Sequence, residues 1–154
     1  MTERGIRARS QSWLEVGEAM VRGEIPQPPV ATLVGFELVA FERGKATMSL
    51  RAGEQHANPM GSLHGGVLCD VADAAMGMAF ASTLEAEETF TTLELKINFM
   101  KPIWDATLQA VGRVVQRGRS IGLVECDILD EDGSFVARAS STCMALRDEQ
   151  ARGR

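Results

Sequence analysis

The order of the predicted elements indicates an antiparallel α+β fold built around one central helix. One helix comes first, followed by two strands, a second helix and four further strands, and we find no internal repeat. Strands alternate with helices in a doubly wound fold, whereas four strands follow one another here, which favours an antiparallel sheet with a helix layer. The second helix is apolar around most of its circumference, so we expect the sheet to wrap around it.

The N-terminal third of the chain is predicted to form a helix, a proline-rich linker and a β-hairpin. Apolar residues recur at helical spacing from Ser12 to about Glu24. The prolines between Pro26 and Pro29 end this helix and form a linker. Residues 31–51 have the pattern of two strands, with Gly44 at the turn between them.

The remainder is predicted to hold the central helix and four strands. Residues 52–63 are rich in Gly, Asn, Pro and Ser and are expected to form a loop, before a helix from about residue 65 to 84. A hairpin turn is expected at Asp132 and Gly133, and the charged residues from 147 to 154 are expected to fray. The predicted strands are residues 89–100, 107–116, 120–129 and 134–146.

Composition favours one globular domain with a core of its own. The chain has 154 residues, a hydrophobic content of 45% and a net charge of -5. This acidic balance argues against a nucleic-acid partner, which requires a basic face. The apolar run at residues 71–81 is too short for a membrane span and is interrupted by Asp73. No secretion signal follows the arginines near the N-terminus, so we expect a cytoplasmic protein without a membrane partner.

The cysteines and histidines predict neither a disulfide framework nor a metal site. Cys69, Cys126 and Cys143 are odd in number and widely spaced, with no C-x-x-C pair. The only histidines are His56 and His64, and they form no H-x-x-x-H or H-E-x-x-H pattern. We therefore expect reduced, buried thiols and no dedicated metal.

The start of the central helix combines the groups that acyl-transfer chemistry needs. Gly65 and Gly66 open the helix, where backbone N–H groups lack intrahelical acceptors and the helix dipole is positive. Asp70 and Asp73 follow in an otherwise apolar helix, and a buried carboxylate is costly unless it is paired, hydrogen-bonded or catalytic. Donors for a developing oxyanion beside a carboxylate would serve acyl transfer.

Several motifs together resemble the hotdog fold, and more narrowly the PaaI-like acyl-CoA thioesterases, a branch that includes 4-hydroxybenzoyl-CoA thioesterases. The resemblance covers about Pro29 to Leu146 and implies residues 1–28 as N-terminal helix and linker, 29–147 as the thioesterase domain and 148–154 as a charged tail. It is carried by Asn58, the His64-Gly65-Gly66 run, the acid at Asp73, the strand Thr91–Pro102, the Arg117-Gly118-Arg119-Ser120 turn, Asp132-Gly133 and residues 137–142.

The resemblance implies hydrolysis of an acyl-CoA to a free acid and CoA, without a cofactor, since CoA is part of the substrate. It makes Asp73 the general base toward water or the nucleophile on the thioester carbonyl. The Gly65 N–H would polarise the thioester oxygen, although a glycine there could also simply relieve crowding. Asp70 is interpreted as a helix-surface or interface residue.

Three further residues have supporting roles by resemblance. His64 would orient the loop and the thioester, with a satisfied histidine or a helix cap as the structural alternative. Asn58 would hold the attacking water or the thioester, and its alternative is a turn former before Pro59. A hydroxyl at Thr92 would position water beside the acid, with Thr91 as a nearby alternative and an ordinary strand residue as the other explanation.

The resemblance also implies CoA contacts and a site shared between subunits. Arginine binds phosphates bidentately, although turn cations are often merely solvated. Met76 and Met78 are interpreted as core, with a part in the acyl tunnel as the alternative. We expect a dimer or tetramer in which the Asn58 and His64 loop of one subunit faces Asp73 of the other. The expected CoA-binding residues are Gly66, Arg117, Gly118, Arg119 and Ser120.

Three other functions compete with hydrolysis, and a purely structural oligomerisation protein is the least favoured of them. A non-catalytic acyl-CoA binding or sensing module would keep the arginines and the fold but would have no use for the acid, so Asp73 discriminates against it. A hotdog hydratase or dehydratase typically needs an Asp and a His a few residues apart, and no histidine follows Asp73 in this chain.

Overall fold

The structure is a computed structural model that describes residues 11–151. It contains three α-helices, six strands and two short 3-10 helices within that range. The α-helices are α1 (Trp13–Val21), α2 (Pro29–Val34) and α3 (Gly65–Ala81), and the 3-10 helices are Glu54–His56 and Asp148–Ala151. The strands are β1 (Phe36–Glu42), β2 (Lys45–Ala52), β3 (Thr89–Phe99), β4 (Ala106–Arg117), β5 (Ile121–Leu129) and β6 (Phe135–Leu146).

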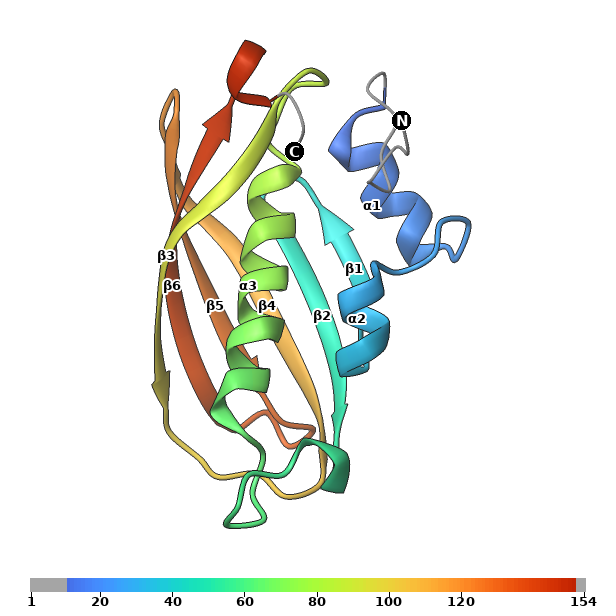
Figure 1. The fold of residues 1–154 in the computed structure, drawn as a ribbon, viewed down its shortest axis with the longest axis vertical. Helices are drawn as coiled ribbons and strands as arrows, with labels where there is room; N and C mark the ends of the chain where they lie inside the picture. The colour runs from blue at the N-terminus through green and yellow to red at the C-terminus, as the bar shows by residue number, and fades with distance from the viewer. Residues whose placement is uncertain (1–10, 152–154) are drawn as a thin grey trace.

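All six strands form one antiparallel sheet that curves around α3 (Figure 1). The strand order is β1-β2-β4-β5-β6-β3, so β1 and β3 are the two edges. The predicted α+β fold, with an antiparallel sheet around a long central helix and an extra N-terminal helix, is confirmed. The predicted hairpin at Gly44 is also confirmed, with Glu42 paired to Lys45 on either side of the turn.

The N-terminal helix packs into the same core as the sheet. Ser12 caps α1: its hydroxyl accepts the Glu15 N–H at 3.2 Å, and the Glu15 carboxylate accepts the Ser12 N–H at 2.8 Å. Val16 and Met20 are buried in the main core. Figure 1 shows α1 and α2 lying beside β1 on the side of the molecule that also carries α3.

The expectation of a strand from residue 31 is wrong, because residues 29–34 form α2. Pro29 occupies the first helical position, where its fixed φ suits a helix and its missing N–H costs no hydrogen bond. Gly35 ends the helix in the left-handed conformation, with a φ of 91°. The strand pattern therefore begins only at Phe36, and part of the predicted linker is helical.

Helix α3 ends three residues before the predicted position and packs closely on β4. A Cβ atom at Gly112 of β4 would lie 2.4 Å from the Ala75 carbonyl oxygen of α3. Only a glycine allows this approach of strand to helix backbone. The buried residues of α3 are Leu68, Val71, Ala72, Ala75, Met76, Gly77, Ala79, Phe80 and Ala81.

The predicted charged tail, residues 148–154, begins with a short 3-10 helix. Arg147, directly after β6, is bonded to Glu88 and Ser120, and Asp148–Ala151 forms a 3-10 helix. The expected fraying is therefore wrong for this stretch, while residues 152–154 lie outside the described range.

Candidate active site

Helix α3 presents its acids on the side that the sheet leaves open. Asp70 and Asp73 are three residues apart, lie on one helix face and are both exposed, whereas Val71 and Ala72 are buried against the sheet. The expectation of a buried carboxylate in this apolar helix is therefore wrong for Asp73 in the single chain. Val71 and Ala72 fill the core, whereas the Asp73 side chain lies at its edge and reaches solvent.

A hydrogen bond joins Asp73 to β3. The Thr92 hydroxyl donates to Asp73 Oδ1 at 2.9 Å. Thr91 does not make this contact; its hydroxyl lies 3.5 Å from the Thr92 carbonyl oxygen. The strand register shifts between Thr92 and Glu94, so a bulge follows the residue that meets the acid. Of the two predicted threonines, the structure brings Thr92 to Asp73.

The cysteine opposite Thr92 is not built for nucleophilic chemistry. Cys143 pairs with Thr92 across the β3–β6 ladder and is buried, and this burial raises the pKa of its thiol. Burial likewise raises the pKa of Cys126 to about 12. Both thiols therefore remain protonated at neutral pH.

The N-terminus of α3 is capped by a histidine. The Gly66 N–H donates to His64 Nδ1 at 2.8 Å, and a Cβ atom at Gly66 would lie 2.9 Å from that nitrogen. Gly65 is the first helical residue, so its N–H has no intrahelical acceptor. The Phe99 ring approaches Gly65 so closely that a Cβ atom there would lie 2.9 Å from it.

Asn58 closes the loop that precedes this helix. Its side-chain oxygen accepts the Met60 N–H at 2.9 Å, and its side-chain nitrogen donates to the Ser62 hydroxyl at 3.0 Å. These contacts are those of a turn former. Within one chain, the helix rise also separates Gly65 from Asp73, eight residues later, by about 12 Å. The structure therefore does not bring the predicted donor and acid together in a single subunit.

An apolar pocket of about 190 Å³ lies beside Asp73 and Thr92. It is lined by residues of six elements (α1, α2, β1, β2, α3 and β3) and of the turn before α2. Met78 belongs to this lining, whereas Met76 is buried in the core, so the two methionines divide between the two predicted roles. The lining residues are Met20, Gln27, Pro28, Val30, Ala31, Phe36, Met48, Asp73, Ala74, Gly77, Met78, Phe90 and Thr92.

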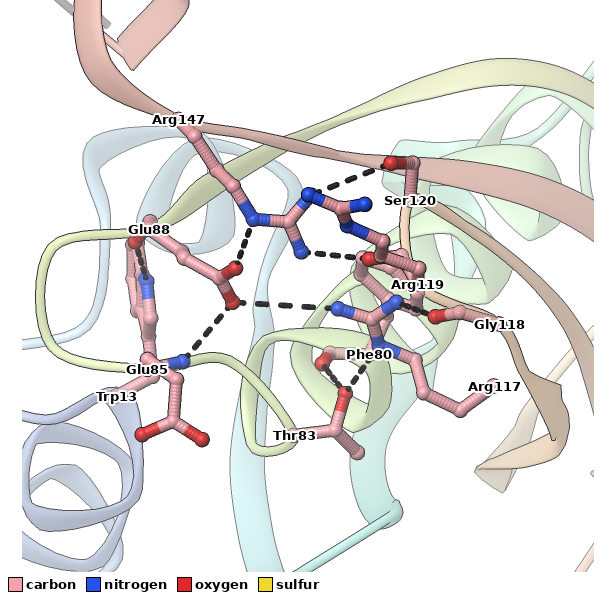
Figure 2. Close-up of polar contacts among 10 residues, drawn as sticks. All are labelled: Trp13, Phe80, Thr83, Glu85, Glu88, Arg117, Gly118, Arg119, Ser120 and Arg147. Carbon is pink, nitrogen blue, oxygen red and sulfur yellow. Dashed lines mark hydrogen bonds and ion pairs between the residues drawn. The ribbon is translucent and has the colours of Figure 1, made fainter.

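The predicted CoA-binding turn at residues 117–120 is held by an ion-pair cluster (Figure 2). Glu88 is only 8% exposed, and its carboxylate forms an ion pair with Arg147. Its Oε2 atom also lies 3.9 Å from Arg117 Nη2. Arg147 also donates to the Ser120 hydroxyl at 3.2 Å and to the Arg119 carbonyl oxygen. Sequence reasoning missed Glu88 because it ends an acidic stretch that resembles a solvated loop.

The two arginines of that turn differ in surroundings. The Arg117 guanidinium lies 4.7 Å from the centroid of the Phe80 ring and donates to the Thr83 hydroxyl at 3.2 Å. It is therefore engaged within the chain. The Arg119 side chain is exposed. Arg119 is the residue of this turn whose charge faces solvent.

Neither a metal cluster nor a membrane-spanning helix is found in residues 11–151. No group of three or more His, Cys, Asp or Glu side chains there could hold a metal ion. None of the helices in this range is long and apolar enough to cross a membrane.

A six-stranded antiparallel sheet curved around one helix, with an acid exposed on that helix, defines a hotdog-fold protein. Residues 60–137 match the thioesterase superfamily model, which is half of the chain. The chain belongs to the thioesterase superfamily and is a thioester hydrolase, so the predicted hotdog and PaaI-like resemblance is confirmed.

Known proteins of similar sequence support the same grouping. A 1,4-dihydroxy-2-naphthoyl-CoA hydrolase from Listeria monocytogenes is 32% identical over 71% of this chain and 89% of its own. The acyl-coenzyme A thioesterase PaaI of Escherichia coli is 28% identical over 70% of this chain and 75% of its own. The crystal structure of a phenylacetic acid degradation-related protein from Ralstonia eutropha is 32% identical, with a TM-score of 0.75 over 83% of this chain and 98% of that one.

Proposed function

We propose that this protein hydrolyses an acyl-CoA thioester to a free acid and CoA. The observation that carries the proposal is the hydrogen-bonded pair of Asp73 and Thr92 beside an apolar pocket. An exposed carboxylate held by a hydroxyl next to an apolar cavity suits a thioester, whose acyl chain is apolar and whose carbonyl carbon must be attacked. The names of the Listeria and Escherichia coli relatives support CoA as the leaving thiol.

Asp73 acts as general base or as nucleophile in this proposal. As base, it takes a proton from water while the water oxygen bonds to the thioester carbon, and CoA leaves as the C–S bond breaks and its sulfur gains a proton. As nucleophile, its free oxygen bonds to that carbon while the C–S bond breaks and CoA leaves as a thiolate that takes a proton from solvent; water then hydrolyses the mixed anhydride, which releases the acid and restores the Asp73 carboxylate. Thr92 holds Oδ1 in both cases, which leaves Oδ2 to react. Neither route needs a cofactor.

The Gly65 N–H polarises the thioester carbonyl from a second subunit. The separation of about 12 Å along α3 is too long for one carbonyl to meet both groups of one chain. A site shared across a dimer removes this conflict. His64 then orients the loop by capping α3, and Asn58 holds it closed near the thioester and the attacking water.

Strand β3 is the surface through which we propose that dimers form. It is an edge strand of 11 residues, so its outer side has unpaired backbone groups. Leu93 and Phe99 on this strand are 52% and 55% exposed, which is unusual for large apolar side chains in a sheet. Pairing of two β3 edges would cover them, and dimers could pair again into tetramers.

We place the CoA contacts at the turn of residues 117–120 and at Gly66. Arg119 provides the charge for a phosphate because its side chain is exposed, while Gly118 lets the backbone approach. Arg117 and Ser120 hold the turn through their bonds to Thr83 and Arg147.

A thioester-cleavage assay on wild type and Asp73→Asn tests this function. Loss of the carboxylate should lower kcat by about 10²–10⁴-fold, the usual contribution of a general base. Asp70→Asn is the matched control, since Asp70 is exposed on the same helix face, and it should keep wild-type activity. If wild type cleaves no acyl-CoA but still binds CoA, the protein is instead a binding or sensing module.

A further inference from the structure

The N-terminal helices form one side of the acyl pocket. Met20 of α1, Gln27 and Pro28 before α2, and Val30 and Ala31 of α2 are among its lining residues. All five precede residue 60, where the match to the thioesterase superfamily begins. This side of the pocket therefore comes from a part of the chain that lies outside the family-matched range.

This side of the pocket is held in place by hydrogen bonds. The Gln27 side-chain oxygen accepts the Leu38 N–H of β1 at 3.1 Å, which ties the turn before α2 to the sheet. His56 Nε2 lies 2.7 Å from the Val34 carbonyl oxygen at the last residue of α2. Both ends of α2 are thus attached to other parts of the fold, and the pocket is preformed.

The lining determines the charge of the group that can enter. Asp73 is the only charged residue among the described residues of the lining, and none of them is Lys, Arg or His. A second carboxylate on the acyl group would lose its hydration without gaining a cation and would be repelled by Asp73. The pocket therefore favours an uncharged acyl group.

The volume determines how large that group can be. A dry apolar cavity of about 150 Å³ holds a benzene molecule. The pocket of about 190 Å³ has room for roughly six to eight carbon atoms. Met20 and Ala31 are buried members of the lining, whereas Val30 is 53% exposed and so borders the solvent at the opening.

We propose that the α1–α2 segment selects a neutral, apolar acyl group of roughly six to eight carbons, linear or aromatic, with Met20 and Val30 as specificity-determining residues. This rests on the proposed thioesterase function and adds the substrate class.

The test compares kcat/KM for a series of acyl-CoAs in wild type and variants. The series is acetyl-, butyryl-, hexanoyl-, octanoyl-, decanoyl-, benzoyl-, phenylacetyl- and glutaryl-CoA. Wild type should show its highest kcat/KM either with hexanoyl-CoA and octanoyl-CoA or with the two aromatic substrates. Its kcat/KM for glutaryl-CoA should be about a hundredfold lower than for hexanoyl-CoA. Comparison of the linear with the aromatic substrates shows whether the pocket selects a linear or an aromatic acyl group.

Val30→Phe narrows the opening at an exposed position and should lower kcat/KM for octanoyl- and phenylacetyl-CoA by about tenfold or more, with butyryl-CoA changed less than about twofold. Leu33→Phe is the matched control, because Leu33 lies on the same helix, is 86% exposed and is not part of the pocket lining. This variant should have the same order of kcat/KM values over the series as wild type. Met20→Ala enlarges the pocket and should raise the ratio of kcat/KM for decanoyl-CoA to that for hexanoyl-CoA by about tenfold.

The outcomes separate this proposal from the function on which it rests. If Val30→Phe and Leu33→Phe give the same profile as wild type, the α1–α2 segment does not select the acyl group, although the enzyme is a thioesterase. If glutaryl-CoA is cleaved as fast as hexanoyl-CoA, the charge argument is wrong. If no member of the series is cleaved, the proposed function itself fails.

Discussion

Gly65 is the residue whose proposed role depends on one backbone hydrogen. It is the first residue of α3, the helical position that tolerates proline best, because no helix bond is lost there. His64 before it has φ −66° and ψ 130°, a conformation that a following proline also accepts. The N–H can therefore be removed by a substitution that leaves the helix start intact.

We expect Gly65→Pro to lower kcat by about 10²–10³-fold, the usual cost of losing one oxyanion donor. Gly65→Ala is the control, since it keeps the N–H and adds only the Cβ that meets the exposed Phe99 ring. Steady-state kinetics with hexanoyl-CoA measures both, and thermal unfolding checks that both fold. Equal losses in the two variants would mean that crowding, and not the N–H, explains the glycine.

Glu88 joins four elements at one end of the sheet. Its backbone carbonyl accepts the Trp13 side-chain N–H of α1 at 3.2 Å, and its carboxylate accepts the Glu85 N–H at 3.0 Å. The same carboxylate meets Arg117 at the end of β4 and Arg147 after β6 (Figure 2). Glu88 directly precedes β3, so this cluster anchors the strand that carries Thr92.

Replacing Glu88 with Gln should destabilise the protein by about 2–4 kcal/mol, because two partly buried arginines lose their shared counter-charge. The comparable change Glu24→Gln removes the exposed ion pair with Arg22 and should destabilise the protein far less, because solvent screens that pair. Urea denaturation at neutral pH measures both. Similar values for the two variants would show that the cluster has no special role.

The whole enzyme requires a second subunit if Gly65 and Asp73 act on one thioester. Their separation along α3 and the exposed edge of β3 both support this arrangement. Symmetric dimers contain two equivalent sites, each built from both subunits. Two inactive variants can then complement each other.

Co-refolding equal amounts of Asp73→Asn and Gly65→Pro should restore about a quarter of wild-type activity, since half of the dimers are mixed and each mixed dimer has one intact site. Either variant refolded alone should remain inactive. Absence of recovered activity, with mixed dimers demonstrated by differential tagging, would contradict a shared site.

Most of the fold could be predicted because its signals are local. The alternation in β3 to β6, the helical spacing after Ser12 and the turns at Gly44 and Gly133 each depend on a few neighbouring residues. Helix α2 is not predicted because its six residues are too few to show a helical period and its proline is equally typical of a linker. The glycine pair, Asp73 and Thr92 were named through motif spacing and resemblance.

The sequence alone was enough to identify the fold class and every strand and α-helix except α2, since side-chain period and turn residues are properties of short segments. The family resemblance made Asp73 the favoured acid. The choice of Thr92 over Thr91, the exposure of Asp73, the cluster around Glu88 and the pocket beneath α1 and α2 required the tertiary structure. Each of these depends on the distance between residues far apart in the chain, which packing sets and local pattern does not record.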